Sequence, residues 1–94
     1  MLFEWDESKN LANQRKHLLR FKEAIHVFGD PLARTVQDRH VHGEERWQII
    51  GSAGGIVVIV VSYTIRQKED EEIYRIISAR KATPSERTRY EETQ

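Results

Sequence analysis

Hydrophobic and polar residues alternate at the start of the chain and then give way to a polar helical segment. Residues 2–5 alternate with period two, which predicts a short strand. Asp6 suits the N-cap of a helix over residues 7–16. Within that helix Leu11 and Ala12 are the apolar residues, so we expect a surface helix with one narrow buried stripe.

A second helix is predicted after residue 20, because four apolar residues recur at i, i+3, i+4 and i+7, the spacing of one buried helical face. These residues are Phe21, Ala24, Ile25 and Phe28. Gly29 suits the left-handed conformation that ends a helix, and Pro31 keeps the residue before it out of the helical region. The helix should therefore stop at this point.

From residue 32 onward the hydrophobic period is two. Strands are predicted over residues 32–37, 46–51 and 56–64, and residues 52–55 contain two glycines that suit a hairpin turn. The strand over 56–64 begins with six successive aliphatic residues and should be central, covered on both faces. Residues 66–72 carry four acids and two bases, which is typical of a solvated loop.

The last strand and helix meet at a well-marked boundary. Regular alternation over residues 73–80 predicts Arg75 on one face of a strand and Arg80 on the other. Thr83 then suits an N-cap, Pro84 the first helical position, and Glu86 the acid of a capping box.

The predicted order of elements is β-α-α-β-β-β-β-α. Consecutive strands with short turns favour an antiparallel sheet of about four to five strands, covered by two N-terminal helices and one C-terminal helix, which is an α+β fold. Ninety-four residues suit one domain, spanning residues 1–94.

Composition narrows the possible functions. The chain contains no cysteine, so disulfide frameworks and thiolate metal sites are excluded. The longest aliphatic run is far shorter than the roughly 18 residues that a membrane-spanning helix needs. Residues 1–10 contain acids where a secretory signal has a basic region, so we expect a cytoplasmic protein.

Positive charge is concentrated in residues 73–90, which carry a local charge of +4 in a chain of zero net charge. Arginine presents a planar fork of donors that matches phosphate oxygens. The segment therefore predicts binding to a polyanion such as RNA, to DNA, or to an acidic partner protein. The acids at residues 69–72 and 91–92 favour, in turn, docking to a basic partner.

A second polar cluster, RHVHGEER, spans residues 39–46. His40, His42 and Glu44 would share one face of an extended segment and resemble part of a zinc site, but no third histidine or cysteine stands at a suitable spacing. We predict no metal here. Histidine and glutamate remain candidates for proton transfer near neutral pH.

Together these residue types are sufficient for cleavage of RNA without a metal. A base takes the proton of the 2′-hydroxyl, cations hold the phosphate as charge builds, and an acid protonates the leaving 5′-oxygen. Spacing alone does not bring the residues together, so a non-catalytic interaction module remains the alternative.

Several segments resemble one known family. FEWDESKN, NQRKH, FKEAIHVFGDP, GEERWQIIG and above all RIISARKATPSERTRYEE resemble the BrnT toxins of bacterial type II toxin-antitoxin systems. The resemblance implies a RelE-like fold and a small cytoplasmic endoribonuclease that needs no cofactor. It also implies a co-encoded BrnA-like antitoxin with a ribbon-helix-helix domain, and repression of their own promoter by the complex through that antitoxin.

The resemblance maps the family's recurrent polar positions onto Lys16, His17, Glu45, Arg46, Arg75, Ser78, Arg80, Glu86 and Tyr90. Arg75 and Arg80 are the preferred phosphate clamps, and Arg46 is a third. Either His17 or Glu45 is expected to accept a proton.

Four further residues are expected to contact substrate: Lys16, Lys81, Arg87 and Tyr90. Tyr90 would either stack on a base or cap the core. Glu86 is explained by the capping box, and Ser78 is expected to pack or to form a hydrogen bond rather than to attack the substrate.

The chain departs from the family pattern directly after His17. Leu18, Leu19 and Arg20 stand where the family has glycine and a small polar residue. Leucine in a left-handed helix stop costs about 1 kcal/mol relative to glycine. We therefore expect a different turn geometry here or a shifted His17.

Overall fold

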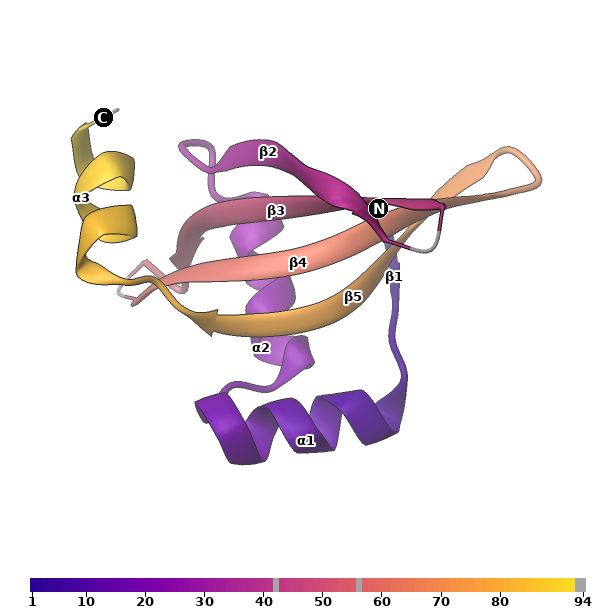
Figure 1. The fold of residues 1–94 in the computed structure, drawn as a ribbon, viewed down its shortest axis with the longest axis horizontal. Helices are drawn as coiled ribbons and strands as arrows, with labels where there is room; N and C mark the ends of the chain where they lie inside the picture. The colour runs from indigo at the N-terminus through magenta and orange to yellow at the C-terminus, as the bar shows by residue number, and fades with distance from the viewer. Residues whose placement is uncertain (42, 56, 93–94) are drawn as a thin grey trace.

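The computed structural model describes residues 1–41, 43–55 and 57–92, with side chains omitted for residues 39–41 (Figure 1). The elements in chain order are β1 (Leu2–Glu4), α1 (Glu7–His17), α2 (Phe21–Ala24), the 3-10 helix η1 (Ile25–Gly29), β2 (Arg34–Val41), β3 (Glu44–Ala53), β4 (Val57–Lys68), β5 (Glu71–Lys81) and α3 (Pro84–Glu92). This order confirms the predicted α+β fold.

The strands form one sheet in the order β1-β5-β4-β3-β2. Strands β2 to β5 are antiparallel, as the short turns predict, and β4 is central. The first strand differs, because β1 lies parallel to β5 with Leu2 opposite Ile73 and Glu4 opposite Arg75. No tight turn joins these two strands, so nothing local dictates an antiparallel direction. The sheet is therefore mixed.

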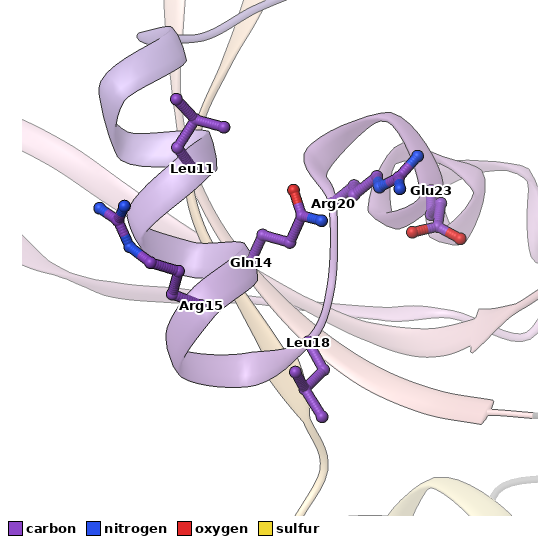
Figure 2. Close-up of a pocket in the computed structure, with 6 residues that line it drawn as sticks. All are labelled: Leu11, Gln14, Arg15, Leu18, Arg20 and Glu23. Carbon is purple, nitrogen blue, oxygen red and sulfur yellow. The ribbon is translucent and has the colours of Figure 1, made fainter.

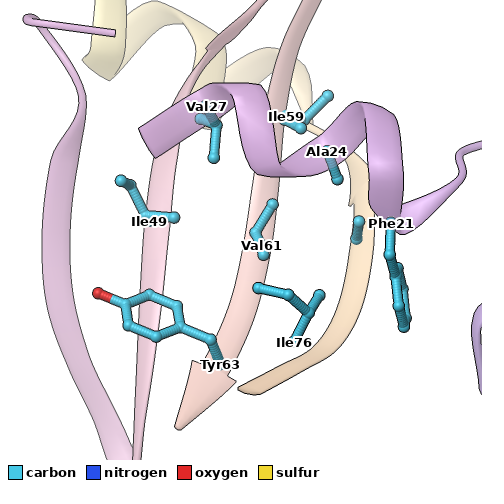
Figure 3. Close-up of a cluster of buried hydrophobic side chains, with 9 residues drawn as sticks. Phe21, Ala24, Val27, Ile49, Ile59, Val61, Tyr63 and Ile76 are labelled. Atoms are coloured by element: carbon cyan, nitrogen blue, oxygen red, sulfur yellow. The ribbon is translucent and has the colours of Figure 1, made fainter. Parts of the chain in front are cut away.

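The hydrophobic core lies between the sheet and the segment formed by α2 and η1 (Figure 3). Phe21, Ala24 and Val27 are completely buried there. Val27 departs from the predicted spacing because the chain tightens after Ala24 into a 3-10 helix, which has three residues per turn. Ile25 and Phe28, predicted on the buried face, are partly buried and pack against the same cluster.

The segment predicted as a loop over residues 66–72 is the paired end of a long hairpin that projects beyond the rest of the sheet (Figure 1). Lys68 lies opposite Glu71, and opposite charges on facing strands favour pairing. The turn itself is confined to Glu69, which has a positive φ of 58°, and Asp70. Polar composition here indicates solvent exposure, not absence of a strand.

A β-bulge interrupts β5. Ser62 lies opposite Ser78, whereas the next residue of β4, Tyr63, lies opposite Ile76, so Ile77 is an extra residue without a partner. The predicted regular alternation over residues 73–80 is therefore wrong. Ile76 before the bulge and Ala79 after it both join the core although they are three residues apart.

The predicted buried stripe of α1 is also wrong. Leu11 is 49% exposed and Ala12 is exposed, whereas Asn10 and Asn13 are buried. An apolar-versus-polar pattern cannot identify this face, because its buried residues are polar.

Both asparagines bind backbone groups that have no partner within a helix or strand. Asn13 accepts a hydrogen bond from the Ala79 N–H (3.0 Å) and donates one to the Leu19 carbonyl (3.0 Å). Asn10 accepts one from the Phe21 N–H (2.9 Å) at the start of α2. Helix α1 thus lies along the edge of β5 that β1 leaves uncovered.

The expected change of geometry after His17 is wrong. Leu18 adopts the left-handed conformation (φ 59°, ψ 29°), and its N–H donates to the Gln14 carbonyl at 2.9 Å. Its side chain is 79% exposed, so it packs little against neighbouring side chains, and the strain of this conformation is confined to its own backbone and Cβ. His17 remains the last residue of α1.

Candidate functional site

The sheet has an open face, defined here as the face opposite α1, α2 and η1. On β4, the core residues Ile59 and Val61 alternate with Val60, Ser62 and Thr64. Because successive side chains of a strand point to opposite faces, these three residues point to the open face.

Three predicted phosphate clamps share this open face. Arg75 lies opposite Thr64 and Arg80 lies opposite Val60, and facing residues of paired strands point the same way. Arg46 points there from β3, since the next residue along that strand packs against the core. The bulge makes this possible, because Arg75 and Arg80 are an odd number of positions apart and would otherwise point to opposite faces.

Arg80 is held by α3 through a bidentate ion pair. Its Nη1 lies 2.7 Å from Oε1 of Glu86, and its Nη2 lies 3.0 Å from Oε2. Glu86 also accepts a hydrogen bond from the Thr83 N–H (2.9 Å), and Thr83 Oγ1 accepts one from the Glu86 N–H (3.2 Å). The predicted capping box is confirmed, and the same carboxylate orients an arginine of the open face.

These contacts determine the charge state of the pair. The hydrogen bonds from Arg80 lower the pKa of Glu86 to about 2, with help from the Thr83 N–H, although burial opposes the shift. The hydrogen bond to Glu86 raises the pKa of Arg80 above its ordinary value. Both side chains are therefore ionised at neutral pH.

Arg75 contacts a carboxylate on the neighbouring strand. Its Nη1 lies 3.3 Å from Oε1 of Glu4, which also lies 2.9 Å from Nε of Arg66. Two arginines thus share one acid, so this group carries a net charge of +1. The side chain of Arg75 remains 38% exposed and can contact a ligand.

Arg46 and Thr64 carry buried polar atoms on adjacent strands. Nε of Arg46 and Oγ1 of Thr64 have no hydrogen-bond partner among the described residues. Oγ of Ser52 is a third such atom, and burying these groups costs free energy unless a water molecule or a ligand binds them.

Other predicted site residues lie off the open face. Lys81 lies opposite the core residue Ile59 and therefore points to the helix-covered side. Lys16 and His17 lie at the end of α1 that approaches the end of β5 (Figure 1). These three residues therefore do not share the face that carries Arg46, Arg75 and Arg80.

Glu45, Arg87 and Ser78 complete the predicted set. Glu45 is exposed and precedes Arg46 on β3, so it points away from the open face. Arg87 is exposed on α3 and pairs with Glu91 at 3.5 Å. Ser78 lies on the open face, opposite Ser62.

The histidines considered for zinc are not placed by the structure, because His42 lies outside the described residues and the side chain of His40 is not described. Within residues 1–41, 43–55 and 57–92, no cluster of three candidate metal ligands occurs. No helix among these residues is long and apolar enough to cross a membrane.

Tyr90 anchors α3 to the body of the protein. It is 6% exposed, and its hydroxyl donates to Oδ2 of Asp30 at 2.5 Å. Asp30 also accepts hydrogen bonds from the N–H groups of Ser52 (2.7 Å) and Leu32 (2.9 Å). Burial raises the pKa of Asp30, but the three hydrogen bonds together have the larger effect, so the pKa lies below its ordinary value. In the sequence, Asp30 stands out only as the residue before Pro31 at the predicted helix stop.

A pocket of about 210 Å³ lies between α3 and the open face. Its lining residues come from β2, β3, β4 and α3: Arg34, Val36, Gln48, Ile50, Val60, Glu86, Arg89 and Tyr90. Since Glu86 binds Arg80, the pocket is adjacent to one of the predicted phosphate clamps.

A larger and more open hollow of about 630 Å³ lies between α1 and α2 (Figure 2). It is lined by Leu11, Gln14, Arg15, Leu18, Arg20 and Glu23. None of these residues belongs to the predicted site, and the hollow lies beside the helices rather than on the open face.

Comparisons with known proteins agree with this architecture. The chain resembles the crystal structure of the Brucella abortus ribonuclease toxin BrnT, with a TM-score of 0.67 and 24% identity over 88% of this chain and 99% of that one. Comparison with curated proteins gives no match. The sequence model of the family described as "Ribonuclease toxin, BrnT, of type II toxin-antitoxin system" matches residues 5–86. The chain therefore belongs to the BrnT family of ribonuclease toxins of type II toxin-antitoxin systems.

Proposed function

We propose that this protein is a metal-independent endoribonuclease that binds the cleaved phosphate on its open face. The observation that carries the proposal is the placement of Arg46 on β3 and of Arg75 and Arg80 on β5, all on the same face of the sheet on either side of β4. Guanidinium groups bind phosphate oxygens through paired hydrogen bonds and stabilise the negative charge that builds on them during cleavage.

The reaction uses the substrate's own 2′-hydroxyl. A base removes its proton, the 2′-oxygen bonds to phosphorus, and the bond to the 5′-oxygen breaks as that oxygen is protonated. The products are a 2′,3′-cyclic phosphate and a 5′-hydroxyl. Glu86 is a positioning residue for Arg80, because a carboxylate with a pKa of about 2 is a weak base.

The remaining roles are proposed from the family resemblance. Glu45 and His17 are the proton acceptors that the resemblance suggests, but both lie off the open face, so neither is proposed as the base for a phosphate held by the three arginines. Contacts with RNA away from the cleaved bond come from exposed cations and from Tyr90, which is one of the residues lining the pocket. The cations proposed for these contacts are Lys16, Lys81 and Arg87.

The proposed partner is a ribbon-helix-helix antitoxin that blocks cleavage in the cytoplasm and binds operator DNA, so that the pair represses its own promoter. Co-expression should yield a complex that shifts operator DNA in a gel. The isolated toxin should not shift it.

The deciding experiment compares wild type with Arg80→Ala in the presence of EDTA. Wild type should cleave RNA at an unchanged rate with EDTA, and Arg80→Ala should cleave about 100- to 1,000-fold more slowly, the usual loss for a donor to a developing oxyanion. Arg15→Ala removes an exposed arginine from α1 and serves as the matched control.

Equal cleavage by wild type and a folded Arg80→Ala variant would contradict the site assignment. Loss of activity in EDTA would contradict metal independence. A folded protein that binds RNA without cleaving it would indicate the non-catalytic interaction module instead.

A further inference from the structure

The pocket between α3 and the open face has an apolar floor and a polar rim. Ile50 faces Val60 across β3 and β4, and Val60 is only 4% exposed. The rim carries two arginines, Arg34 and Arg89, both exposed. A flat apolar floor below cations suits a planar aromatic group attached to a phosphate backbone.

The size of the pocket limits its occupant. About 210 Å³ is below the roughly 300–1,000 Å³ typical of pockets for drug-sized ligands. It suits a single nucleobase better than a whole nucleotide or a peptide segment. The phosphates on either side of that base would remain outside, within reach of the rim arginines.

The position of the pocket relates this base to the proposed cleavage site. Val60, on the floor, lies opposite Arg80 in the sheet register, and Glu86, in the wall, binds the Arg80 guanidinium. A phosphate held by Arg80 is therefore next to the pocket. The base inside belongs to a nucleotide flanking that phosphate.

Gln48 supplies the groups that read a base edge. It lies opposite Val36 on β2 and opposite Ser62 on β4, so its side chain points to the open face. Its carboxamide offers a donor and an acceptor side by side, and within the described chain it forms no side-chain hydrogen bond with another residue. Glutamine can bind a base through both groups at once.

We propose that this pocket binds one unstacked base of the RNA beside the cleaved bond, and that Gln48 determines which base is preferred. The inference rests on the proposed ribonuclease function and adds a sequence preference to it.

The test maps cleavage sites in a pool of short RNAs with randomised sequence. Wild type should show a base preference at one position next to the cleaved bond. Gln48→Leu, which keeps a similar shape without hydrogen-bonding groups, should reduce that preference at least fivefold, because a bidentate base contact contributes about 5- to 150-fold discrimination. Total cleavage should stay within about threefold of wild type, since the proposed arginine clamps are untouched.

Two further variants sharpen the result. Gln48→Glu removes the donor and keeps the acceptors, so it should change which base is preferred rather than only weaken the preference. Gln14→Leu makes the same replacement in the hollow between the helices and should keep the wild-type profile. An unchanged profile in a folded Gln48→Leu variant overturns the proposal.

A binding measurement separates failure of the pocket from failure of the ribonuclease function. Wild type is titrated with 2′-O-methyl oligonucleotides, which lack the attacking hydroxyl, carrying one abasic position in turn. One abasic position should weaken binding about tenfold, as expected when a stacked base is lost, and Gln48→Leu should reduce that effect. If no position matters, the pocket proposal is wrong whether or not RNA is cleaved.

Discussion

Glu86 connects two functions at the scale of a single residue. Its carboxylate accepts hydrogen bonds from the Thr83 N–H at the start of α3 and from the Arg80 guanidinium at the end of β5. The spacing from Thr83 was enough to predict the first contact. The second depends on how the chain turns between β5 and α3, and no local pattern encodes it.

The lowered pKa of Glu86 predicts a loss of stability in acid. Its pKa is about 2 in the folded protein and 4.5 without these contacts, so its contribution is complete above about pH 4.5 and disappears as the pH falls to about 2. Partial solvent exposure reduces that contribution to about 1–2 kcal/mol. Urea unfolding from pH 2 to pH 7 measures it.

Glu86→Gln is the control for this titration. Asp6 and Asp30 also have lowered pKa values and titrate in acid in both proteins. The difference in unfolding free energy between wild type and Glu86→Gln should therefore shrink towards pH 2. A difference independent of pH would contradict the assignment.

Leu18 predicts a gain in stability on substitution. It holds a left-handed conformation at the end of α1 with an exposed side chain, so little packing is lost on its removal. Leu18→Gly should raise the free energy of unfolding by about 0.5–1 kcal/mol. Leu11→Gly, at an exposed position inside the same helix, should lower it by about 1 kcal/mol. Urea denaturation measures the free energy of unfolding of both variants. A Leu18→Gly variant less stable than wild type would show that the left-handed conformation of Leu18 is not strained.

At the scale of elements, α1 covers the edge of β5 with side-chain amides. The Asn13 carboxamide binds the Ala79 N–H and the Leu19 carbonyl, which are 60 positions apart in sequence. Asparagine in a helix reads as a surface residue, so hydropathy alone cannot reveal this contact. Its physical basis is the requirement that buried backbone groups form hydrogen bonds.

Asn13→Leu should therefore destabilise the protein by about 2–4 kcal/mol, because two backbone groups lose their partners. Differential scanning calorimetry and urea unfolding measure the change. Gln14→Leu, one position along, should alter stability by less than about 0.5 kcal/mol. Equal effects of the two substitutions would show that Asn13 has no special role.

At the scale of the whole molecule, zero net charge conceals an uneven distribution. The open face gathers Arg46, Arg75 and Arg80, whereas the end of the β4–β5 hairpin carries the acids at residues 69–72. RNA should approach the open face and avoid the hairpin. Total charge alone would predict no such orientation.

This distribution predicts a measurable salt dependence. If Arg46, Arg75 and Arg80 each contact a different phosphate of a single strand, one of them the cleaved phosphate, the logarithm of the binding constant should fall with the logarithm of salt concentration with a slope of about −2. Fluorescence anisotropy with a 2′-O-methyl oligonucleotide, at salt concentrations from about 50 to about 200 mM, measures this slope. Arg75→Ala should reduce the slope by about 0.7, and Arg15→Ala should leave it unchanged. A slope near zero would remove the arginines from the RNA interface.

Sequence periodicity was sufficient for the order and type of the elements, and the capping box located α3. The missing information concerned relations between distant segments. The parallel pairing of β1, the amide contacts of α1 and the anchoring of Tyr90 to Asp30 all join residues far apart in the chain. The shared face of Arg75 and Arg80 depends on one unpaired residue, Ile77, which resembles any other aliphatic strand residue in sequence.

Ile77 divides β5 into two parts, and the alternation of side chains between the two faces of the sheet shifts by one residue from one part to the other. Deleting one residue at the bulge would rotate either the part with Arg75 or the part with Arg80 by half a turn, without changing a single charged side chain. A chimeric protein whose two parents are joined inside β5 would keep all three arginines. Arg75 and Arg80 would nevertheless point to opposite faces of the sheet unless the chimera kept the bulge. The spacing of the arginines is therefore as much a determinant of the site as their identity.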